Sequence, residues 1–529
     1  MTNAQVASTL EEYAALLELA GASTFSARAY RRAADLIRSL PLPVLDLVRE
    51  GRVRELRGIG SGIEARLVEL AEHGQIAELE ELRQQTSPEL AALGRLLGFG
   101  PRLGAEIGTQ LGIRTADELR AAAADGRLRQ VKGIGPQKEA AILAALAREH
   151  EVEARPLTLP RARALTDRIA EGLGGVPAGD PRRWRDASTS LAVVVVTKEP
   201  DDVRRQFAAL PEIVSVTGDV GLTLEGTPIQ LVVTAPESFG TALMRATGSA
   251  EYVAALGPLP DAPDEEGVYR ALGLPHLPPE LRELPVPGAV PELVTVERIR
   301  GDLHCHTTWS DGRASVLEMA EAACGRGYEY LAICDHTAGL RVVPGLTADD
   351  LRRQAVEIAA ANEALAPFRV LRGTECDVLP DGTLDLPDDV LAELDWVQIS
   401  LHAGQRAPRR ELTARVLYAM HHPAARSLSH PLGRLIGHRP ENALDLEQTF
   451  ETAVATGVAL EVNGLPDRLD LSGEHVRQAL AAGVKITCST DSHSIAGLDN
   501  MPLSVYTARR GWAGPDDVLN TRPLAELLR

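Results

Sequence analysis

GDLHCHTTWSDG, residues 301–312, carries two histidines one residue apart and an aspartate shortly after them. Alternate side chains of an extended segment point to the same side, so His304 and His306 can bind one ion together. Asp311 follows in the next loop. Imidazole and carboxylate groups in such an arrangement are typical ligands of a transition-metal ion. The stretch therefore predicts a strand whose end contributes to a metal site.

The same arrangement recurs through the C-terminal part of the chain. Seven apolar runs alternate with helical stretches, which predicts βα repeats that close into a barrel of parallel strands. The runs are 298–304, 330–336, 368–375, 396–402, 425–430, 458–464 and 484–493. Six of them end in His, Asp or Glu within a residue or two. The strand ends of a parallel barrel gather at one rim, so we expect convergence of His304, His306, Asp311, His336, Glu375, His402, His430, Asp491 and His493.

A metal site explains this set better than chance. A single histidine at a strand end is usually only a polar residue near water, but nine such groups at recurring boundaries predict metal binding. Nitrogen and oxygen donors without thiolates suit Zn, Mn or Fe. The five cysteines form no CxxC pair, which opposes a disulfide framework and a four-cysteine zinc site. Cys305, Cys334 and Cys488 adjoin the ligands, and we expect them in the packing.

The composition sets further bounds. A chain of 529 residues exceeds one hydrophobic core, so several domains are expected. No apolar run of about 20 residues could span a membrane, and the N-terminus lacks the basic start of a signal peptide. A cytoplasmic, nucleoid-associated protein is therefore expected. The net charge of −19 opposes tight nonspecific DNA binding, but residues 1–150 hold 19 Lys and Arg against 20 Asp and Glu.

Three similar segments lie in those first 150 residues: LRGIGSGIEARL (56–67), LLGFGPRLGAEI (96–107) and VKGIGPQKEAAI (131–142). In each, two glycines permit a tight turn before a helix whose first N–H groups are free. Such groups bind a phosphate without reading sequence. One GxG pattern often marks only a helix end, but three with the same flanks predict binding of the DNA backbone. The candidate residues are Gly58, Gly60, Gly98, Gly100, Gly133, Gly135 and Lys138.

The C-terminal motifs resemble one known family. GDLHCHTTWSDG, ICDHT, GTECDV, SLHAG, SHPLGRLIG, EVNGLPDRLDL and STDSHS together resemble the PHP (polymerase and histidinol phosphatase) domain over residues 300–510. The resemblance implies a phosphoesterase with three divalent ions, Mn or Zn and alternatively Fe. One ion would be held by His304, His306, Glu375 and Asp491, which are also the catalytic candidates. The second would be held by Asp311, His336 and His493, and the third by Glu375, His402 and His430. Arg434 and Arg468 are candidates to clamp a phosphate.

The rest of the chain resembles a second family. The glycine segments look like helix-hairpin-helix motifs, and FSARAYRRAA (25–34), SFGTALMRATGS (238–249) and ALGLPHLPPELRE (271–283) resemble family X DNA polymerases. The implied fold is multidomain, α and α/β, with a polymerase-beta-like palm and thumb before a distorted (β/α)7 PHP barrel. The expected domains are a helical small domain (1–85), a fingers-like helical domain (86–150), a degenerate palm (151–255), a thumb remnant with a Pro-rich extended linker (256–299) and the PHP domain (300–529).

The polymerase pattern breaks at its catalytic positions. Family X polymerases hold two Mg²⁺ with a D-x-D pair and a third Asp on a neighbouring strand. Ser190 and Ala192 occupy the D-x-D positions of this chain, and Gln230 occupies the third. The preceding G-S-x-R-R signature survives only as Gly-Asp-Pro-Arg-Arg at 179–183. We therefore predict that polymerase activity is lost.

The resulting hypothesis is a monomeric DNA repair nuclease that acts on gapped, nicked or 3′ ends. Its expected activity is a metal-dependent 3′–5′ exonuclease, with abasic-site endonuclease and 3′-phosphatase as further candidate activities. Three alternatives stay open. They are a polymerase that retains weak synthesis, a noncatalytic protein that binds DNA ends, and a small-molecule phosphatase resembling histidinol phosphatase.

Overall fold

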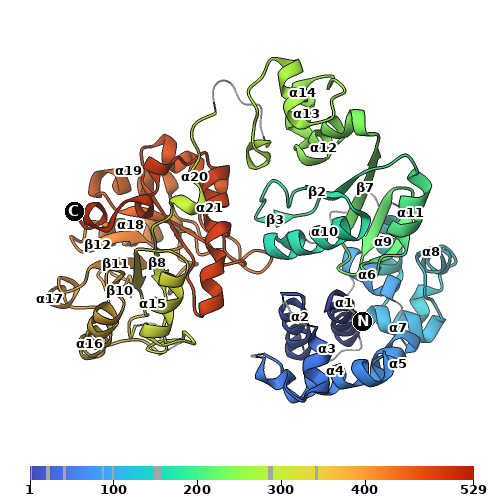
Figure 1. The fold of residues 1–529 in the computed structure, drawn as a ribbon, viewed down its shortest axis with the longest axis horizontal. Helices are drawn as coiled ribbons and strands as arrows, with labels where there is room; N and C mark the ends of the chain where they lie inside the picture. The colour runs from blue at the N-terminus through green and yellow to red at the C-terminus, as the bar shows by residue number, and fades with distance from the viewer. Residues whose placement is uncertain are drawn as a thin grey trace.

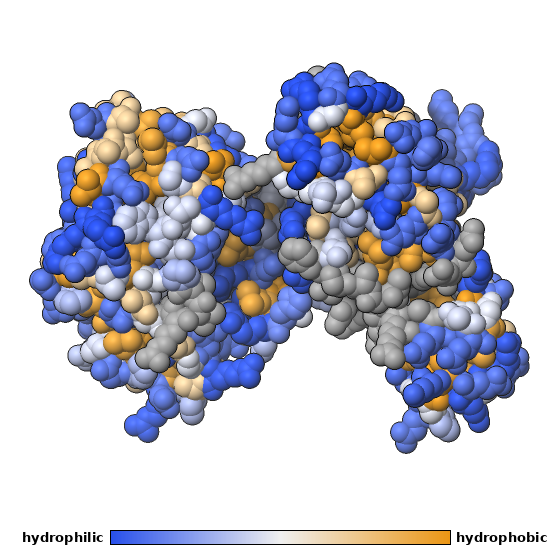
Figure 2. All heavy atoms as spheres, turned by 90° about the horizontal axis from the view of Figure 1, so that it is seen from below, coloured by the Kyte–Doolittle hydropathy of each residue, from blue (hydrophilic) through white to orange (hydrophobic). Residues whose placement is uncertain are grey.

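The computed structural model describes residues 1–529 with the exception of 2, 20–23, 40–42, 57, 86–87, 98–100, 148–155, 284–289 and 340–343. Figure 1 shows a barrel of strands and helices, yellow to red, on one side of the molecule and the preceding domains on the other. The surface in Figure 2 is mainly hydrophilic, with hydrophobic residues in separate small areas. None of the described helices is long and apolar enough to cross a membrane.

The N-terminal region is helical and has two hydrophobic cores. The helices are α1 (Asn3–Leu19), α2 (Thr24–Ser39), α3 (Val44–Arg49), η1 (Val53–Glu55), α4 (Ser61–His73), α5 (Ala77–Gln85), α6 (Pro88–Leu96), α7 (Pro101–Leu111), α8 (Ala116–Ala124), η2 (Leu128–Gln130) and α9 (Pro136–Ala147). The first core includes Leu10, Ile37 and Leu67 from α1, α2 and α4. The second extends from α6 to α9 and also takes in Leu222 of the next domain, so the two domains share buried apolar surface.

A five-stranded sheet follows, in the order β2-β4-β7-β6-β5. Its elements are α10 (Leu159–Leu173), β2 (Val176–Gly179), β4 (Leu191–Val196), α11 (Pro200–Ala208), β5 (Ile213–Thr217), β6 (Val220–Thr223) and β7 (Pro228–Thr234), with β1 (Leu157–Thr158) and β3 (Ala187–Ser188) as a separate pair. The apolar run of β4 is buried because β2 and β7 flank it while α10 and α12 cover it. β4 and β7 run parallel, with Ala192 opposite Gln230.

The thumb region contains η3 (Pro236–Ser238), α12 (Phe239–Thr247), α13 (Ala250–Leu256), α14 (Glu265–Leu272) and η4 (Pro279–Leu281). The Pro-rich connector expected as an extended linker is packed where it is described. Leu277 and Leu281 fill a core with Tyr269 of α14, and Arg282 is completely buried beside Glu265. The described part of the connector therefore packs through the ion pair of Arg282 with Glu265 and through Leu277 and Leu281.

The C-terminal domain is a nearly closed barrel of seven parallel strands in sequential order, as the sequence predicts. The strands are β8 (Gly301–Cys305), β9 (Tyr330–Ile333), β10 (Arg369–Asp377), β11 (Trp396–Ser400), β12 (Ala425–Leu428), β13 (Ala459–Asn463) and β14 (Ile486–Ser489). The main helices are α15 (Val316–Gly325), α16 (Ala348–Ala364), α17 (Asp388–Leu391), α18 (Arg409–Met420), α19 (Leu446–Thr456), α20 (Gly473–Ala481), α21 (Met501–Arg510) and α22 (Leu524–Leu527). The N–H of His306 donates to the carbonyl of Ser492 at 2.8 Å, which joins the first strand to the segment after the last.

Candidate metal centre

The nine side chains singled out by the sequence meet at the rim of the barrel. The possible ligand atoms of eight of them form three close groups. The ninth residue, His430, contacts Glu375. The groups are His306, Asp311, His336 and His493; His304, His306 and Asp491; and His336, Glu375 and His402. His306 thus belongs to two groups and His336 approaches Glu375, so the ligands form one continuous cluster.

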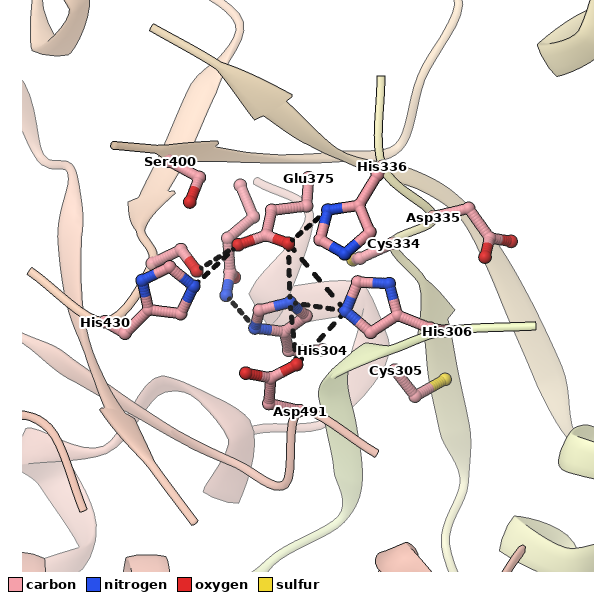
Figure 3. Close-up of polar contacts among 12 residues, drawn as sticks. His304, Cys305, His306, Cys334, Asp335, His336, Glu375, Ser400, His430 and Asp491 are labelled. Atoms are coloured by element: carbon pink, nitrogen blue, oxygen red, sulfur yellow. Dashed lines mark hydrogen bonds and ion pairs between the residues drawn. The ribbon is translucent and has the colours of Figure 1, made fainter. Parts of the chain in front are cut away.

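Glu375, at the end of β10, lies at the centre of this cluster (Figure 3). Its Oε2 is 3.0 Å from His336 Nδ1 and 3.5 Å from His304 Nε2. Its Oε1 is 2.9 Å from His430 Nε2 and 3.3 Å from His402 Nε2. One carboxylate therefore faces imidazoles from four other strand ends, which is the position a bridging ligand requires.

Two aspartates complete the other side of the cluster. Asp491 Oδ1 lies 3.1 Å from His306 Nε2. Asp311 Oδ2 lies 3.3 Å from His493 Nε2, and its Oδ1 lies 3.6 Å from His336 Nε2. These distances are short enough for each carboxylate to share an ion with its imidazole neighbours.

Several ligand atoms are buried without a hydrogen bond. They are Nδ1 of His306, His336 and His430 and Oε2 of Glu375. A buried polar atom left unsatisfied costs free energy, and a shared cation would satisfy His336 Nδ1 and Glu375 Oε2, which lie 3.0 Å apart. The donor set of imidazoles and carboxylates therefore fits divalent metal ions.

The backbone at two ligands adopts the left-handed region, which side chains other than glycine rarely occupy. His430 has a φ of 23° and Asp491 a φ of 52°. Each follows the end of a barrel strand, where the chain must turn while the side chain still points inward. Such conformations cost about 1–3 kcal/mol and are concentrated at functional sites.

Electrostatic coupling inside the cluster shifts the pKa of its members. Burial opposes ionisation of Glu375, but His402, His304 and His336 outweigh it and hold the carboxyl pKa well below its usual range. Burial also opposes ionisation of His402 and by itself would lower its pKa, but Glu375 and Asp377 raise that pKa to about 10. For His306, burial and the neighbouring His493 and His336 lower the pKa to about 3. Glu375 and His402 thus hold each other ionised while His306 is held neutral, and a divalent ion would compete with the proton of a charged ring such as His402.

The sequence did not reveal the residues that orient the ligands. Glu461, inside β13, has Oε1 2.7 Å from His304 Nδ1 and accepts from the His430 N–H at 2.6 Å. Asp377, two residues after Glu375, has Oδ1 2.6 Å from His402 Nδ1. Carboxylates of this kind fix the tautomer and the ring orientation of a ligating histidine. Their one sequence signal is a charged residue in a buried apolar run.

The two arginine candidates have different surroundings. Arg468 turns toward the cluster: its Nε is 3.7 Å from Asp491 Oδ2, and its buried Nη1 has no hydrogen-bond partner. Arg434 instead donates from Nε to the carbonyl of Arg468 at 2.9 Å and has Nη2 2.7 Å from Asp186 of the palm. The guanidinium of Arg434 is thus held at the interface between two domains, and its role as a phosphate clamp stays a prediction.

The cysteines beside the ligands are buried in packing, as expected. Cys305, Cys334 and Cys488 are all inaccessible to solvent, and Figure 3 shows the Cys305 thiol directed away from Glu375. Burial raises the pKa of the Cys488 thiol to about 12. These thiols are thus uncharged and do not belong to the ligand set.

Two of the glycine segments have matching turns before a helix. In the first, Ile59 N–H donates to Leu56 and the φ of Gly58 is 104°. In the third, Ile134 N–H donates to Val131 and the φ of Gly133 is 94°. Side chains rarely tolerate such angles. Gly98 and Gly100 of the second segment lie outside the described residues.

The following glycines, Gly60 and Gly135, directly precede α4 and α9. Neither has a positive φ, and a Cβ at either position would meet no atom within 4 Å. The fold itself therefore leaves open space in front of both helix N-termini. Lys138 is exposed on the first turn of α9, so it can add a positive charge there.

The palm holds no carboxylate at the three expected positions. Ala192 lies directly opposite Gln230 on the neighbouring strand, and Ser190 immediately precedes β4. The adjacent Asp180 accepts from the N–H groups of Thr189 and Ser190 at 2.9 Å each and pairs with Arg183. Its carboxylate is thus already occupied by donors.

Comparisons with known proteins agree with this architecture. A family model described as a helix-hairpin-helix domain matches residues 1–76. The chain is 29% identical to a probable phosphatase of Acetivibrio thermocellus, over 36% of this chain and 78% of that protein. It is 27% identical to a probable phosphatase of Photobacterium profundum, over 38% of this chain and 80% of that protein. Both phosphatases resemble the C-terminal part.

One relative matches from end to end. The DNA polymerase/3′-5′ exonuclease PolX of Bacillus subtilis is 35% identical over 98% of this chain and 97% of that protein. Its alignment includes the helix-hairpin-helix region, the palm and the barrel that carries the histidine and carboxylate cluster. The palm of this chain carries Ser190, Ala192 and Gln230 where the resemblance expects aspartates, while the barrel brings together nine imidazole and carboxylate groups. The chain therefore belongs to the bacterial family X DNA polymerases that carry a C-terminal PHP domain.

Proposed function

We propose that the protein is a DNA repair nuclease whose barrel hydrolyses phosphodiester bonds from 3′ ends, and that its palm has lost polymerase activity. The observation that carries this proposal is the convergence of nine imidazole and carboxylate groups, several with buried unsatisfied atoms, in a chain that also carries helix-hairpin-helix motifs. A cluster of this size is consistent with three divalent ions, Mn or Zn.

The chemistry expected at the cluster is hydrolytic. Bound divalent ions would supply Lewis-acid chemistry, polarising a phosphodiester and lowering the pKa of water. Glu375 would hold two of them, because its two oxygens face different imidazole groups. Arg468 has a free donor at the edge of the cluster and is suited to bind a nonbridging phosphate oxygen. Glu461 and Asp377 would keep the rings of His304 and His402 in their ligating orientation.

The helical region supports DNA as the substrate. The open N-termini of α4 and α9 provide N–H groups that bind phosphates irrespective of base sequence. A phosphatase for a small metabolite has no use for two such motifs. Nonspecific backbone binding suits an enzyme that acts on DNA ends of any sequence.

Loss of synthesis is proposed from the palm. Nucleotidyl transfer requires carboxylates that hold two Mg²⁺. Ala192 and Gln230 pair on β4 and β7, and the resemblance to family X polymerases expects aspartates at these positions. Arg182 and Arg183, the remnant of the nucleotide-binding signature, are paired with Glu265 and Glu283. Both guanidinium groups therefore already bind carboxylates of the thumb region.

The central test is a nuclease assay on 5′-labelled DNA with single metals and an EDTA control. We expect a ladder that shortens from the 3′ end with Mn²⁺ or Zn²⁺, and no product from the His304→Ala/His306→Ala variant. Substrates with a 3′-phosphate or an abasic site test the further candidate activities in the same assay. Absence of product with every metal would contradict the proposal, and hydrolysis of p-nitrophenyl phosphate alone would favour a small-molecule phosphatase.

A separate assay tests the palm. Primer extension on gapped DNA with all four dNTPs should give no product with wild-type protein in Mg²⁺ or Mn²⁺. The His304→Ala/His306→Ala variant serves as the substrate-preserving control, since it cannot remove newly added nucleotides. Extension by that variant would show that the palm retains synthesis.

A further inference from the structure

A loop of the palm reaches the barrel through one buried carboxylate. Asp186, directly before β3, has Oδ2 2.7 Å from Arg434 Nη2 and Oδ1 3.6 Å from Arg510 Nη1. The exposed fractions of these side chains are 17%, 12% and 12%. In Figure 1, β3 and α10 accordingly face α21 of the barrel. An ion pair this well shielded from water binds its partners in one geometry rather than several.

Arg434 also binds a turn of the barrel. Its Nε donates to the carbonyl of Arg468 at 2.9 Å, and its Nη2 donates to the carbonyl of Leu469 at 2.5 Å. Leu469 has a φ of 45°, a conformation that leucine adopts only when its surroundings impose it. The forked guanidinium therefore holds the turn through two successive carbonyls.

The turn carries Arg468 to the metal centre. The Arg468 Nε lies 3.7 Å from Asp491 Oδ2, and its Nη1 is buried with no hydrogen-bond partner. Asp491 is itself one of the nine ligands, so the guanidinium lies at the edge of the cluster. The direction of this side chain depends on the backbone that Arg434 fixes.

Apolar and aromatic contacts close the same interface. Leu159 of the palm packs with Leu469 and Leu503 of the barrel. Trp184 stacks on Tyr506 of α21, with ring centroids 3.8 Å apart and an interplanar angle of 5°. The turn at Leu469 is thus covered by the palm on its outer side, while its inner side faces the metal centre.

We propose that Asp186 is a positioning residue of the nuclease: through Arg434 it fixes the turn at 468–469 and aims Arg468 at the phosphate of the DNA end. The loop that carries Asp186 follows the remnant of the nucleotide-binding signature at 179–183. The palm would therefore hold the turn at 468–469 of the barrel in place. This inference rests on the proposed nuclease function and adds the requirement that the palm be docked for hydrolysis.

The test compares full-length variants in the nuclease assay. We expect Asp186→Asn to lower kcat by up to about 100-fold, because a small displacement of a catalytic group has effects of that size. Metal content, melting temperature and the Kd for DNA should stay near wild type. Asp219→Asn is the matched control, since Asp219 is a palm carboxylate between β5 and β6 that pairs with Arg204 at 2.7 Å, and it should leave kcat unchanged.

A double-mutant cycle separates positioning from general destabilisation. If Asp186 acts through Arg468, then Asp186→Asn should cause little further loss in an Arg468→Ala background. Arg434→Lys provides a second variant for the case that Asp186→Asn does not fold. It retains the charge pair with Asp186 but cannot bind both carbonyls, and it should show the same loss. Wild-type kcat in both single variants, or multiplying losses in the double variant, overturns the proposal.

Binding of inorganic phosphate to the Mn²⁺-loaded protein gives a readout without turnover. Calorimetric titration should show weaker phosphate binding in Asp186→Asn and Arg468→Ala than in Asp219→Asn. If wild-type protein cuts no DNA but phosphate binding still depends on both residues, the proposed nuclease function fails and the positioning role stands. If DNA is cut and phosphate binding is insensitive to Asp186, the positioning role fails alone.

Discussion

Glu461 and His304 form a buried pair, with Glu461 Oε1 2.7 Å from His304 Nδ1 and both side chains inaccessible to solvent. The pair leaves His304 Nε2 facing Glu375 and Asp491. An imidazole whose other nitrogen donates to a carboxylate is held in one tautomer and is a stronger metal ligand.

Glu461→Gln should therefore weaken metal binding even though Glu461 touches no proposed ion. We expect a loss of about 10–100-fold in metal affinity or activity, measured by Mn²⁺ titration and by nuclease rate. Glu451→Gln, on the exposed face of α19, is the control and should bind metal like wild type. Equal affinity in Glu461→Gln and wild type would show that Glu461 has only a packing role.

Metal binding should release protons, and its affinity should rise with pH. Neighbouring carboxylates raise the pKa of His304 well above its usual range, that of His402 to about 10 and that of His493 to about 9, against the opposing effect of burial. These raised pKa values favour protonated rings at neutral pH in the metal-free protein, and a bound ion must displace the protons. The apparent association constant should then rise with pH near neutrality, by at least about one decade per pH unit.

Calorimetry in buffers of different ionisation enthalpy measures this release directly. More than one proton per protein should be liberated when the cluster fills at pH 7. The His402→Gln variant, which removes one of the raised pKa values, should release about one proton fewer. A binding enthalpy independent of the buffer would refute the competition between ions and protons.

The barrel and the convergence of the nine side chains could be predicted because both follow local rules. Alternation of apolar runs with helical stretches gives the strands, and the shared rim of a parallel barrel makes strand-end residues such as His336 and His402 neighbours. That prediction does not require knowing which residues pair between distant strands. The same rules did not predict the surroundings of Arg434, because they depend on how the palm packs against the barrel.

Residues whose role depends on tertiary contacts were not predictable. Glu461 lies in the middle of an apolar run and becomes functional only because His304 and His430 approach it from other strands. The connector around Leu281 has the Pro-rich composition of a linker, but Glu265 pairs with the buried Arg282 and draws it into a core. In each case the deciding partner is distant in sequence.

Replacing Gly60 or Gly135, the glycines directly before α4 and α9, by aspartate should weaken DNA binding without affecting folding. Gly60 is the N-cap of α4, with extended backbone angles and no side-chain cap, and Asp caps a helix at least as well as Gly. Gly60→Asp and Gly135→Asp should therefore keep the melting temperature. A negative charge at these N-termini should repel a phosphate, and we expect the Kd for DNA to rise about 10-fold, equivalent to roughly 1.4 kcal/mol.

Fluorescence anisotropy with labelled duplex DNA at fixed salt measures this Kd. Gly325→Asp is the charge-matched control, because Gly325 lies in open space at the end of α15 in the barrel. That variant should bind DNA like wild type. If all three variants bind equally well, these helix N-termini do not contact DNA.

The contact between thumb and palm should depend on the ionisation of Glu265. The side chain is 11% exposed and pairs with Arg182 at 2.7 Å and with the buried Arg282. Burial alone would raise the carboxyl pKa, but the two guanidinium groups outweigh it and lower the pKa to about 2. A depressed carboxyl pKa adds stability above the unfolded-state value near 4.5, and this stability is lost as the pH falls toward 2.

Glu265→Gln removes the charge at every pH, so its effect should itself depend on pH. At pH 7 we expect a loss of about 1.5–3 kcal/mol in the free energy of unfolding, the range for hydrogen bonds to charged groups. Below pH 4.5 the difference from wild type should shrink, because wild-type Glu265 then loses its own advantage through protonation. Glu266→Gln, at the exposed neighbouring position of α14, serves as the control. A difference between Glu265→Gln and wild type that is constant from pH 7 to pH 3 would mean that the pair contributes through shape and not through charge.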